Sequence, residues 1–143
     1  MAITQAMCSS FKTELLTGTH NFTNSSGNTF KLALYTSSAT INAATTAYTS
    51  SNEVSSTNYT AKGGALTNVT PSNGSGTVAF TSFSTLTFTN VTLTARGALI
   101  HNSSQSDKAV CALDFGGDKT ATAGNFTITF PTNDASTAVI RIV

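Results

Sequence analysis

The chain has 143 residues and a formal net charge of +1, and only 9% of its residues are charged. A typical globular domain carries about a quarter. This length fits one domain, and the small net charge excludes the strongly basic surface typical of proteins that bind nucleic acid or membranes. No apolar run reaches the roughly 18 residues of a membrane span, and no leader pattern opens the chain. We therefore expect synthesis in the cytoplasm without a signal peptide, and a surface partly hidden in an assembly.

The N-terminal region divides into an arm and a helix. Residues 1–8 show no periodic pattern, so we expect an extended N-terminal arm followed by a single β-sandwich domain over residues 9–143. A helix is predicted over residues 10–17, between a serine that can cap it and a glycine that can stop it. Phe11 and Leu15 lie one turn apart, and so short a helix must dock this stripe onto a sheet to be stable.

The rest of the chain is typical of short strands separated by turns. Apolar residues alternating with threonine predict strands over residues 29–35, 65–70, 77–83, 86–94, 125–130 and 138–143. With the central hairpin described below, this pattern predicts an all-β fold, an antiparallel β-sandwich or jelly roll of about eight strands with one short N-terminal helix. The expected core is Phe30, Leu32, Leu34, Phe80, Phe88, Leu99, Leu113, Phe115, Phe126, Ile128, Phe130 and Ile140.

Two features interrupt this regular pattern. Residues 36–62 are small and polar, which predicts a long surface excursion containing at most a short strand or one helical turn. In the run from 86 to 94, the apolar positions change parity near Asn90. Because side chains alternate along a strand, such a change indicates a β-bulge at that point.

Residues 94–115 form the most distinctive stretch, a predicted hairpin whose two arms are apolar on both faces. A strand that is apolar on both sides must be covered on both sides. We expect Arg96 to pair with Asp114 across the hairpin, which places Ile100 opposite Val110 and Leu99 opposite Cys111. This register leaves one apolar face beside the core, to be covered either by the docked helix or by another subunit. The interface candidates are Arg96, Ala98, Ile100, Val110, Ala112 and Asp114.

The titratable residues show no catalytic or metal-binding pattern. The chain has two histidines and six acidic residues, and its sequence holds no nucleophile-elbow motif. Cys8 and Cys111 are far apart in apolar or helical contexts, so we expect two reduced, partly buried thiols. No catalytic residue, cofactor or metal site is predicted, and we expect the protein not to be an enzyme.

Tyr48 and Tyr59 are the aromatic residues that could contact a glycan, because they lie in the polar excursion and the chain has no tryptophan. The alternative is that both rings anchor the excursion on the sheet.

Four segments carry a resemblance to a known group of proteins. They read SFKTELLTGTHNF, TFKLALYTSSAT, TAYTSSNEV and TARGALIHNSS followed by KAVCALDFGGDK. Over nearly the whole chain they resemble small Thr/Ser-rich virion structural proteins of tailed bacteriophages with marine or cyanobacterial hosts. The TARGALI and LDFG segments are the most distinctive parts.

The resemblance implies a virion component without catalytic residues. The first hypothesis is a capsid decoration (cement) protein, a β-rich homo-oligomer, with a trimer favoured, that binds the major capsid protein or another virion protein. The alternative is a tail-associated or receptor-binding module whose excursion contacts host surface glycans. Neither hypothesis involves nucleic acid or a membrane.

Overall fold

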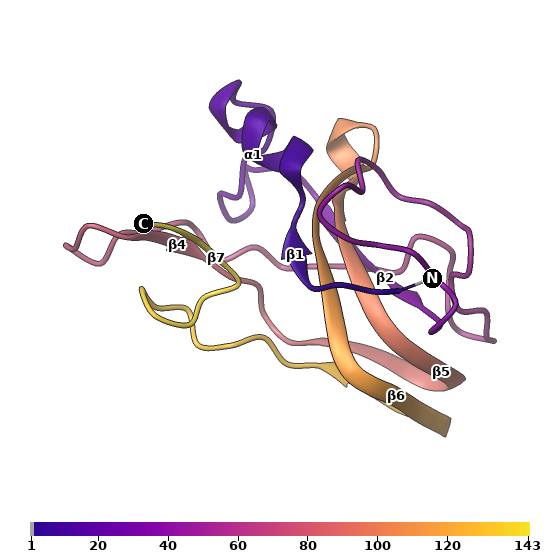
Figure 1. Ribbon diagram of the computed structural model, residues 1–143. Coiled ribbons are helices and arrows are strands. Elements are labelled where there is room, and N and C mark those ends of the chain that lie inside the picture. Colours follow the sequence, from indigo (N-terminus) through magenta and orange to yellow (C-terminus); the bar gives the residue numbers. More distant parts are fainter. Residues whose placement is uncertain (1) are drawn as a thin grey trace.

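The computed structural model describes residues 2–143, and antiparallel strands dominate it (Figure 1). In chain order its elements are β1 (Ala6–Met7), α1 (Ser9–Leu16), β2 (Phe30–Tyr35), β3 (Gly64–Ala65), β4 (Ala79–Thr81), β5 (Leu86–Asn102), a 3₁₀ turn (Ser103–Gln105), β6 (Lys108–Ile128) and β7 (Ile140–Ile142). The predicted all-β class with one short N-terminal helix is confirmed. The excursion over residues 36–62 contains isolated bridges and turns.

A long hairpin of β5 and β6 is the centre of the larger sheet, whose strand order is β1-β6-β5-β2-β3. The two strands have 17 and 21 residues and pair antiparallel along most of their length. Both are rich in threonine and apolar residues, which suit a pleated, half-buried surface. β4 and β7 form a separate two-stranded antiparallel sheet.

The hairpin folds back on itself. The rings of Phe115 and Phe126 lie 6.1 Å apart although both belong to β6, where eleven residues of straight strand would span about 36 Å. The pairing shifts register between Phe88 and Val91, and Asn90 has a φ of 53°. The predicted bulge near Asn90 is therefore confirmed. The ribbons of β5 and β6 turn back together (Figure 1).

The folded-back arm covers one face of the sheet. A Cβ placed on Gly64 of β3 would lie 3.0 Å from Leu86 Cδ1, so the start of β5 packs directly over the far edge of the same sheet. Phe88 and Phe126 of this arm are buried. At the other end of the sheet, Phe30 stacks on Phe22 with ring centroids 4.2 Å apart.

The opposite face is covered by the N-terminal arm and the excursion. β1 pairs with β6, and a Cβ on Gly97 of β5 would lie 2.9 Å from Ile3 Cδ1. Ile3 also bridges to Ile41 of the excursion, which is fully buried. Tyr35 donates a hydrogen bond from its hydroxyl to the Thr49 carbonyl oxygen. The predicted arm thus packs against the sheet from Ile3 onward, while Met1 lies outside the described residues.

The register of the hairpin differs from the expected one. Ile100 lies opposite Cys111 rather than Val110, and Leu99 lies opposite Ala112 rather than Cys111. This prediction was wrong because the pairing shifts between Ile100 and His101, where β6 carries one residue more than β5. An uninterrupted alternation of apolar residues does not reveal such a bulge.

The same shift places Asp114 opposite Gly97 instead of Arg96, and a second shift, between Ala95 and Gly97, then brings Lys119 opposite Ala95. The ion pair nevertheless forms, with Arg96 Nε 3.2 Å from Asp114 Oδ1. The pairing of the charges was therefore predicted correctly, and the backbone register inferred from it was not.

The single α-helix has eight residues and docks through Phe11, which is fully buried. Across residues 2–143, no helix combines the length and the apolar character that a membrane crossing requires.

Candidate functional site

Four of the six interface candidates lie inside the chain. Ala98, Ile100, Val110 and Ala112 all have a relative exposure of 0%. The chain supplies their cover itself, and the backbone N–H of Cys8 donates to the Val110 carbonyl oxygen at 3.0 Å beside β6. The observed register also places Ala98 and Ile100 on one face of the sheet and Ala112 on the other, so the single apolar face that was expected does not form. Of the two covers considered, another subunit is not needed, because these four residues are inaccessible in a single folded chain.

Arg96 and Asp114, the other two candidates, stay partly exposed, with side-chain exposures of 37% and 27%. The backbone N–H of Gly116 donates to Asp114 Oδ1 at 2.9 Å. This hydrogen bond and the Arg96 guanidinium hold the pKa of the Asp114 carboxyl below its usual range. Both side chains border the point where β6 leaves the ladder, which gives them a local structural role there.

Tyr48 and Tyr59, the two glycan candidates, are joined by one carboxylate. Their hydroxyls donate to Glu53 Oε1 at 2.5 Å and to Glu53 Oε2 at 2.7 Å. The same Oε2 accepts the backbone N–H of Lys62, and the Tyr59 oxygen accepts the N–H of Leu34. Both tyrosines are partly buried, and burial is the largest cause that raises their pKa values, to about 12 for Tyr48. The arrangement fits the anchoring alternative, and glycan contact stays a prediction.

A buried polar cluster surrounds His20, which follows α1. Its Nε2 lies 2.9 Å from Glu14 Oε1, and its Nδ1 accepts a hydrogen bond from Asn102 Nδ2 at 2.9 Å. The same amide donates to Asn28 Oδ1, and Lys108 Nζ lies 3.2 Å from Glu14 Oε2. The cluster ties α1 and the following loop to the β5–β6 turn.

A second polar cluster surrounds His101, near the end of β5. Its ring lies 5.2 Å from the Tyr48 ring, and its Nε2 lies 3.0 Å from the Lys62 carbonyl oxygen. Its Nδ1 lies 3.2 Å from Asp107 Oδ1, and the other carboxylate oxygen of Asp107 binds Lys62 Nζ. This cluster ties the excursion to the β5–β6 turn.

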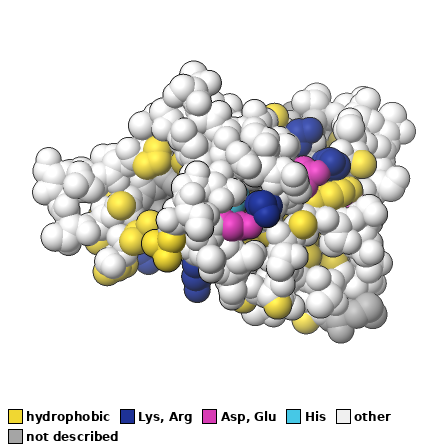
Figure 2. All heavy atoms as spheres, turned by 90° about the horizontal axis from the view of Figure 1, so that it is seen from above, with side chains coloured by type: hydrophobic (Ala, Val, Ile, Leu, Met, Phe, Trp, Pro, Cys, Tyr) yellow, Lys and Arg dark blue, Asp and Glu magenta, His cyan; other side chains and the backbone are white. Residues whose placement is uncertain are grey.

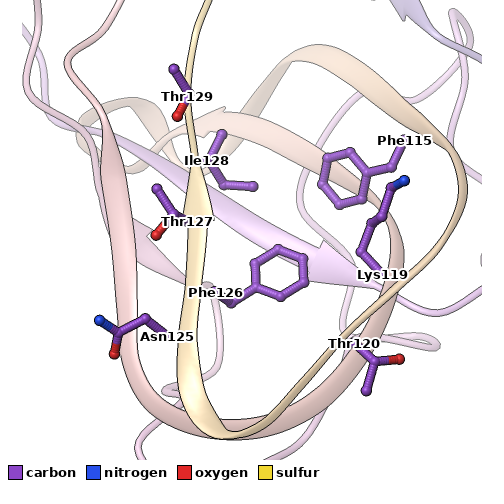
Figure 3. A pocket seen from close by; sticks show the side chains of 8 residues that line it. All are labelled: Phe115, Lys119, Thr120, Asn125, Phe126, Thr127, Ile128 and Thr129. Atoms are coloured by element: carbon purple, nitrogen blue, oxygen red, sulfur yellow. The ribbon is translucent and has the colours of Figure 1, made fainter.

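An open pocket of about 440 Å³ lies where β6 folds back (Figure 3). Phe126 points across it toward Phe115, and Ile128 points to the same side of its strand. Lys119 is the charged residue in its lining, and no carboxylate faces it among the lining residues. The pocket can accept an apolar group, and it lacks the paired acid and base that hydrolytic chemistry requires.

Hydrophobic side chains gather at the end of the molecule that carries β4 and β7 (Figure 2). Leu16 of α1 is 91% exposed and Ile142 of β7 is 55% exposed. Leu15, Phe80 and Ile142 line an open pocket of about 420 Å³. We call Leu15, Leu16, Phe80 and Ile142 the apolar end surface. It is a candidate site for binding another protein.

The cysteines are free, as predicted. Burial and the charge of Glu14 raise the pKa of the Cys8 thiol to about 11, and burial and Cys8 raise that of Cys111 to about 12. Neither thiol therefore ionises near neutral pH, which disfavours nucleophilic chemistry. Within residues 2–143, no three His, Cys, Asp or Glu side chains group as a metal ion would require.

Both histidine clusters, the Glu53 anchor (Glu53 with the hydroxyls of Tyr48 and Tyr59) and the apolar end surface were not predicted from the sequence. A usable signal existed for one of them. Asp107 follows the predicted hairpin arm that ends at His101, so a tight turn would return its carboxylate toward the imidazole. The contacts of Glu53 had no such signal, because they lie in a segment without periodicity.

Comparisons with protein-family models, with curated proteins and with solved structures found no match to this chain. A functional proposal therefore depends on the geometry of the chain and on the resemblance in its sequence.

Proposed function

We propose that this chain is a virion structural protein of a tailed bacteriophage, and that it is a capsid decoration protein. The observation that carries the proposal is the apolar end surface. Ile142 exposes a large apolar side chain at an open pocket that Leu15 and Phe80 also line, and Leu16, the residue after Leu15, is 91% exposed. Apolar surface that faces water is typical of contact sites for other proteins.

The composition supports the same conclusion. A chain with 9% charged residues has few charges to keep isolated subunits apart. A protein that functions within an assembly needs less electrostatic repulsion between its copies. The partners we propose are other copies of this chain, as a trimer, and the major capsid protein or another virion protein.

The fold is compatible with this role. The folded-back hairpin packs Leu86 over Gly64, which supports the predicted arrangement of two packed layers. The described residues form seven strands, in one sheet of five and one of two. The eight-stranded sandwich or jelly roll therefore remains a proposal.

A double variant tests the apolar end surface directly. Leu16→Gln with Ile142→Thr removes the exposed apolar groups and keeps residues suited to a helix and a strand. We expect the purified variant to fold normally but to lose binding to empty capsids of its phage and oligomerisation in light scattering. Thr89→Gln, at an exposed position of β5, is the matched control. Unchanged capsid binding by a folded double variant would reject this surface as the contact.

Counting the copies of this protein per particle distinguishes a location in the tail from one in the head. Hundreds of copies per particle support the head, and a small multiple of three or six supports the tail. Electron microscopy of particles labelled with antibody to this protein gives the location independently. At present no structural observation favours glycan contact, since the hydroxyls of Tyr48 and Tyr59 are bound to Glu53.

A further inference from the structure

His101 is buried between two groups that can only accept hydrogen bonds. Its Nε2 lies 3.0 Å from the Lys62 carbonyl oxygen and its Nδ1 lies 3.2 Å from Asp107 Oδ1. A neutral imidazole carries one N–H, so it satisfies only one of two acceptors. Nε2 donates to Lys62, and Nδ1 has no hydrogen-bond partner in the described part of the chain. The neutral ring therefore donates no hydrogen bond to the Asp107 carboxylate.

Protonation would supply the missing N–H, but the surroundings oppose a second positive charge. The side chain of His101 is fully buried. The carboxylate of Asp107 is already paired with the Lys62 ammonium. Lys31 of β2 lies directly opposite His101 in the ladder and adds positive potential. An imidazolium here would lose its hydration and gain the attraction of a carboxylate that is already neutralised.

The other charged groups near the ring do not change this balance. Glu53 binds the Tyr48 hydroxyl behind the Tyr48 ring, and it also binds the Lys62 N–H. Lys108, which follows the turn, pairs with Glu14 of the other cluster. Each of these charges has a partner of its own.

The contacts around His101 join residues 46–62 to the β5–β6 turn. The N–H of Tyr48 donates to the Asp107 carbonyl oxygen at 2.9 Å, and the N–H of Ala109 donates to the Thr46 carbonyl oxygen at 3.0 Å. Apart from these contacts and those of Glu53, the segment consists of turns and isolated bridges, the kind of structure that opens locally at a lower free-energy cost than a sheet.

We propose that His101 is a pH-sensitive latch, and that its protonation in mild acid releases residues 46–62 from the β5–β6 turn. In the released state the imidazole reaches water, where its charge costs little. The proton therefore binds the released state more tightly than the closed one and shifts the population toward release. The inference does not depend on the proposed role in a virion.

The direction of the pKa shift agrees with this geometry. Burial lowers the pKa of His101 below its usual value of 6.5, although the Lys62 carbonyl and Asp107 act in the opposite direction. The population of the released state relative to the closed state rises by up to about tenfold for each pH unit below 6.5. The rise stops once the pH has fallen below the pKa of His101 in the closed state.

Amide hydrogen exchange followed by NMR tests the latch. The reporters are the N–H groups of Tyr48 and Ala109, which bridge the segment and the turn. After correction for intrinsic exchange, we expect their protection factors to fall from pH 7.5 to pH 5.0, by at most about thirtyfold, the limit set by a pKa of 6.5 in the released state. The N–H of Leu66, bonded to the Phe30 carbonyl, is the internal control and should change little. Constant or rising protection of the reporters at pH 5.0 would overturn the proposal.

Two variants test whether the pH dependence of protection is due to His101. His101→Gln places an uncharged amide donor near Nε2, and we expect it to make the protection of Tyr48 and Ala109 independent of pH. His20→Gln, the matched control, should keep the wild-type response. If His101→Gln does not fold, the ring of His101 is titrated in the wild-type protein. A ring pKa below 6.5 that coincides with the loss of protection supports the latch, and a ring pKa of 6.5 or above rejects it.

Discussion

The two histidines of this chain are both buried, and their neighbours give them different chemistry. His20 faces one acceptor, Glu14, and one donor, the side-chain amide of Asn102. A neutral imidazole satisfies both, so this cluster is complete without a charge. His101 faces two acceptors, Lys62 and Asp107, and no neutral form satisfies both. The two clusters therefore differ in the hydrogen-bond character of the groups around the ring, and the neutral His101 ring leaves one acceptor without a donor.

The clusters are otherwise similar, which makes the comparison informative. Each has one carboxylate, and in each a lysine pairs with it: Lys108 with Glu14 and Lys62 with Asp107. The lysine side chains are 42% and 45% exposed. The main difference therefore lies at Nδ1 of each ring. In His20 this nitrogen faces the Asn102 amide, and in His101 it faces the Asp107 carboxylate.

Removing the Asn102 side chain should have the largest effect. Asn102 is fully buried, donates to His20 and Asn28, and accepts from the Ser104 N–H. Asn102→Ala leaves buried groups without partners at about 1–3 kcal/mol each, so we expect a loss of about 3 kcal/mol or more in the free energy of unfolding. Urea denaturation at pH 7.5 measures it.

The control is Asn125→Ala, at an exposed position of the folded-back arm where the side chain accepts one hydrogen bond, from the Asn90 N–H. It should cost less than about 0.5 kcal/mol. Equal losses for the two variants would show that the His20 cluster contributes no more than a surface amide.

The Glu53 anchor holds the segment that presents the Lys62 carbonyl to His101. Glu53→Ala removes the acceptor of both tyrosine hydroxyls and of the Lys62 N–H. We expect a loss of about 2–3 kcal/mol, because hydrogen bonds to a charged group are stronger than neutral ones. Faster amide exchange over residues 46–62 should accompany it. Asp118→Ala, at an exposed position of β6, is the matched control. If the stability is lost while exchange over residues 46–62 stays slow, Glu53 does not anchor this segment.

The local features of the fold were predictable from the sequence because they depend on near neighbours. The short helix, β2 and the bulge at Asn90 were predicted from the spacing of Phe11 and Leu15, from alternation and from a change of parity. The predicted serine cap was wrong, because Cys8 is the N-cap and makes no side-chain capping bond. The alternating residues Phe126 and Ile128 are buried as predicted. Phe80, Leu113, Phe115 and Phe130 were also expected in the core and are only partly buried, because each lines an open pocket.

The long-range features were not predictable in the same way. The fold-back of β6 depends on a contact between Phe115 and Phe126 across a turn that alternation does not reveal. The His20 cluster joins residues 82 positions apart, and the His101 cluster joins residues 39 apart. A polar residue gives no sign in the sequence of which distant partner it will meet, so both clusters became visible only in the structure.

Asp107→Asn sharpens the comparison by converting the second cluster into the form of the first. The new amide can donate to His101 Nδ1, as the Asn102 amide donates to His20 Nδ1. The neutral ring is then satisfied, and the negative charge that attracted a proton is gone. We expect the pKa of His101 to fall further, and stability at pH 7.5 to change by no more than about 1 kcal/mol. NMR titration of the ring measures the pKa, and a rise would contradict this account of the cluster.

The two lysines should give the smallest effects, and they differ in kind. Because both are nearly half exposed, Lys108→Met and Lys62→Met should each cost less than about 1 kcal/mol at pH 7.5. Lys62→Met also frees the carboxylate of Asp107, which then attracts an imidazolium more strongly and raises the pKa of His101. Since a depressed histidine pKa gives stability that is present above pH 6.5 and lost below it, Lys62→Met should reduce the loss of stability between pH 7 and pH 5. Lys108→Met should leave that loss unchanged. Urea denaturation at the two pH values compares them, and equal pH dependence in both variants would mean that the Asp107 charge does not act on His101.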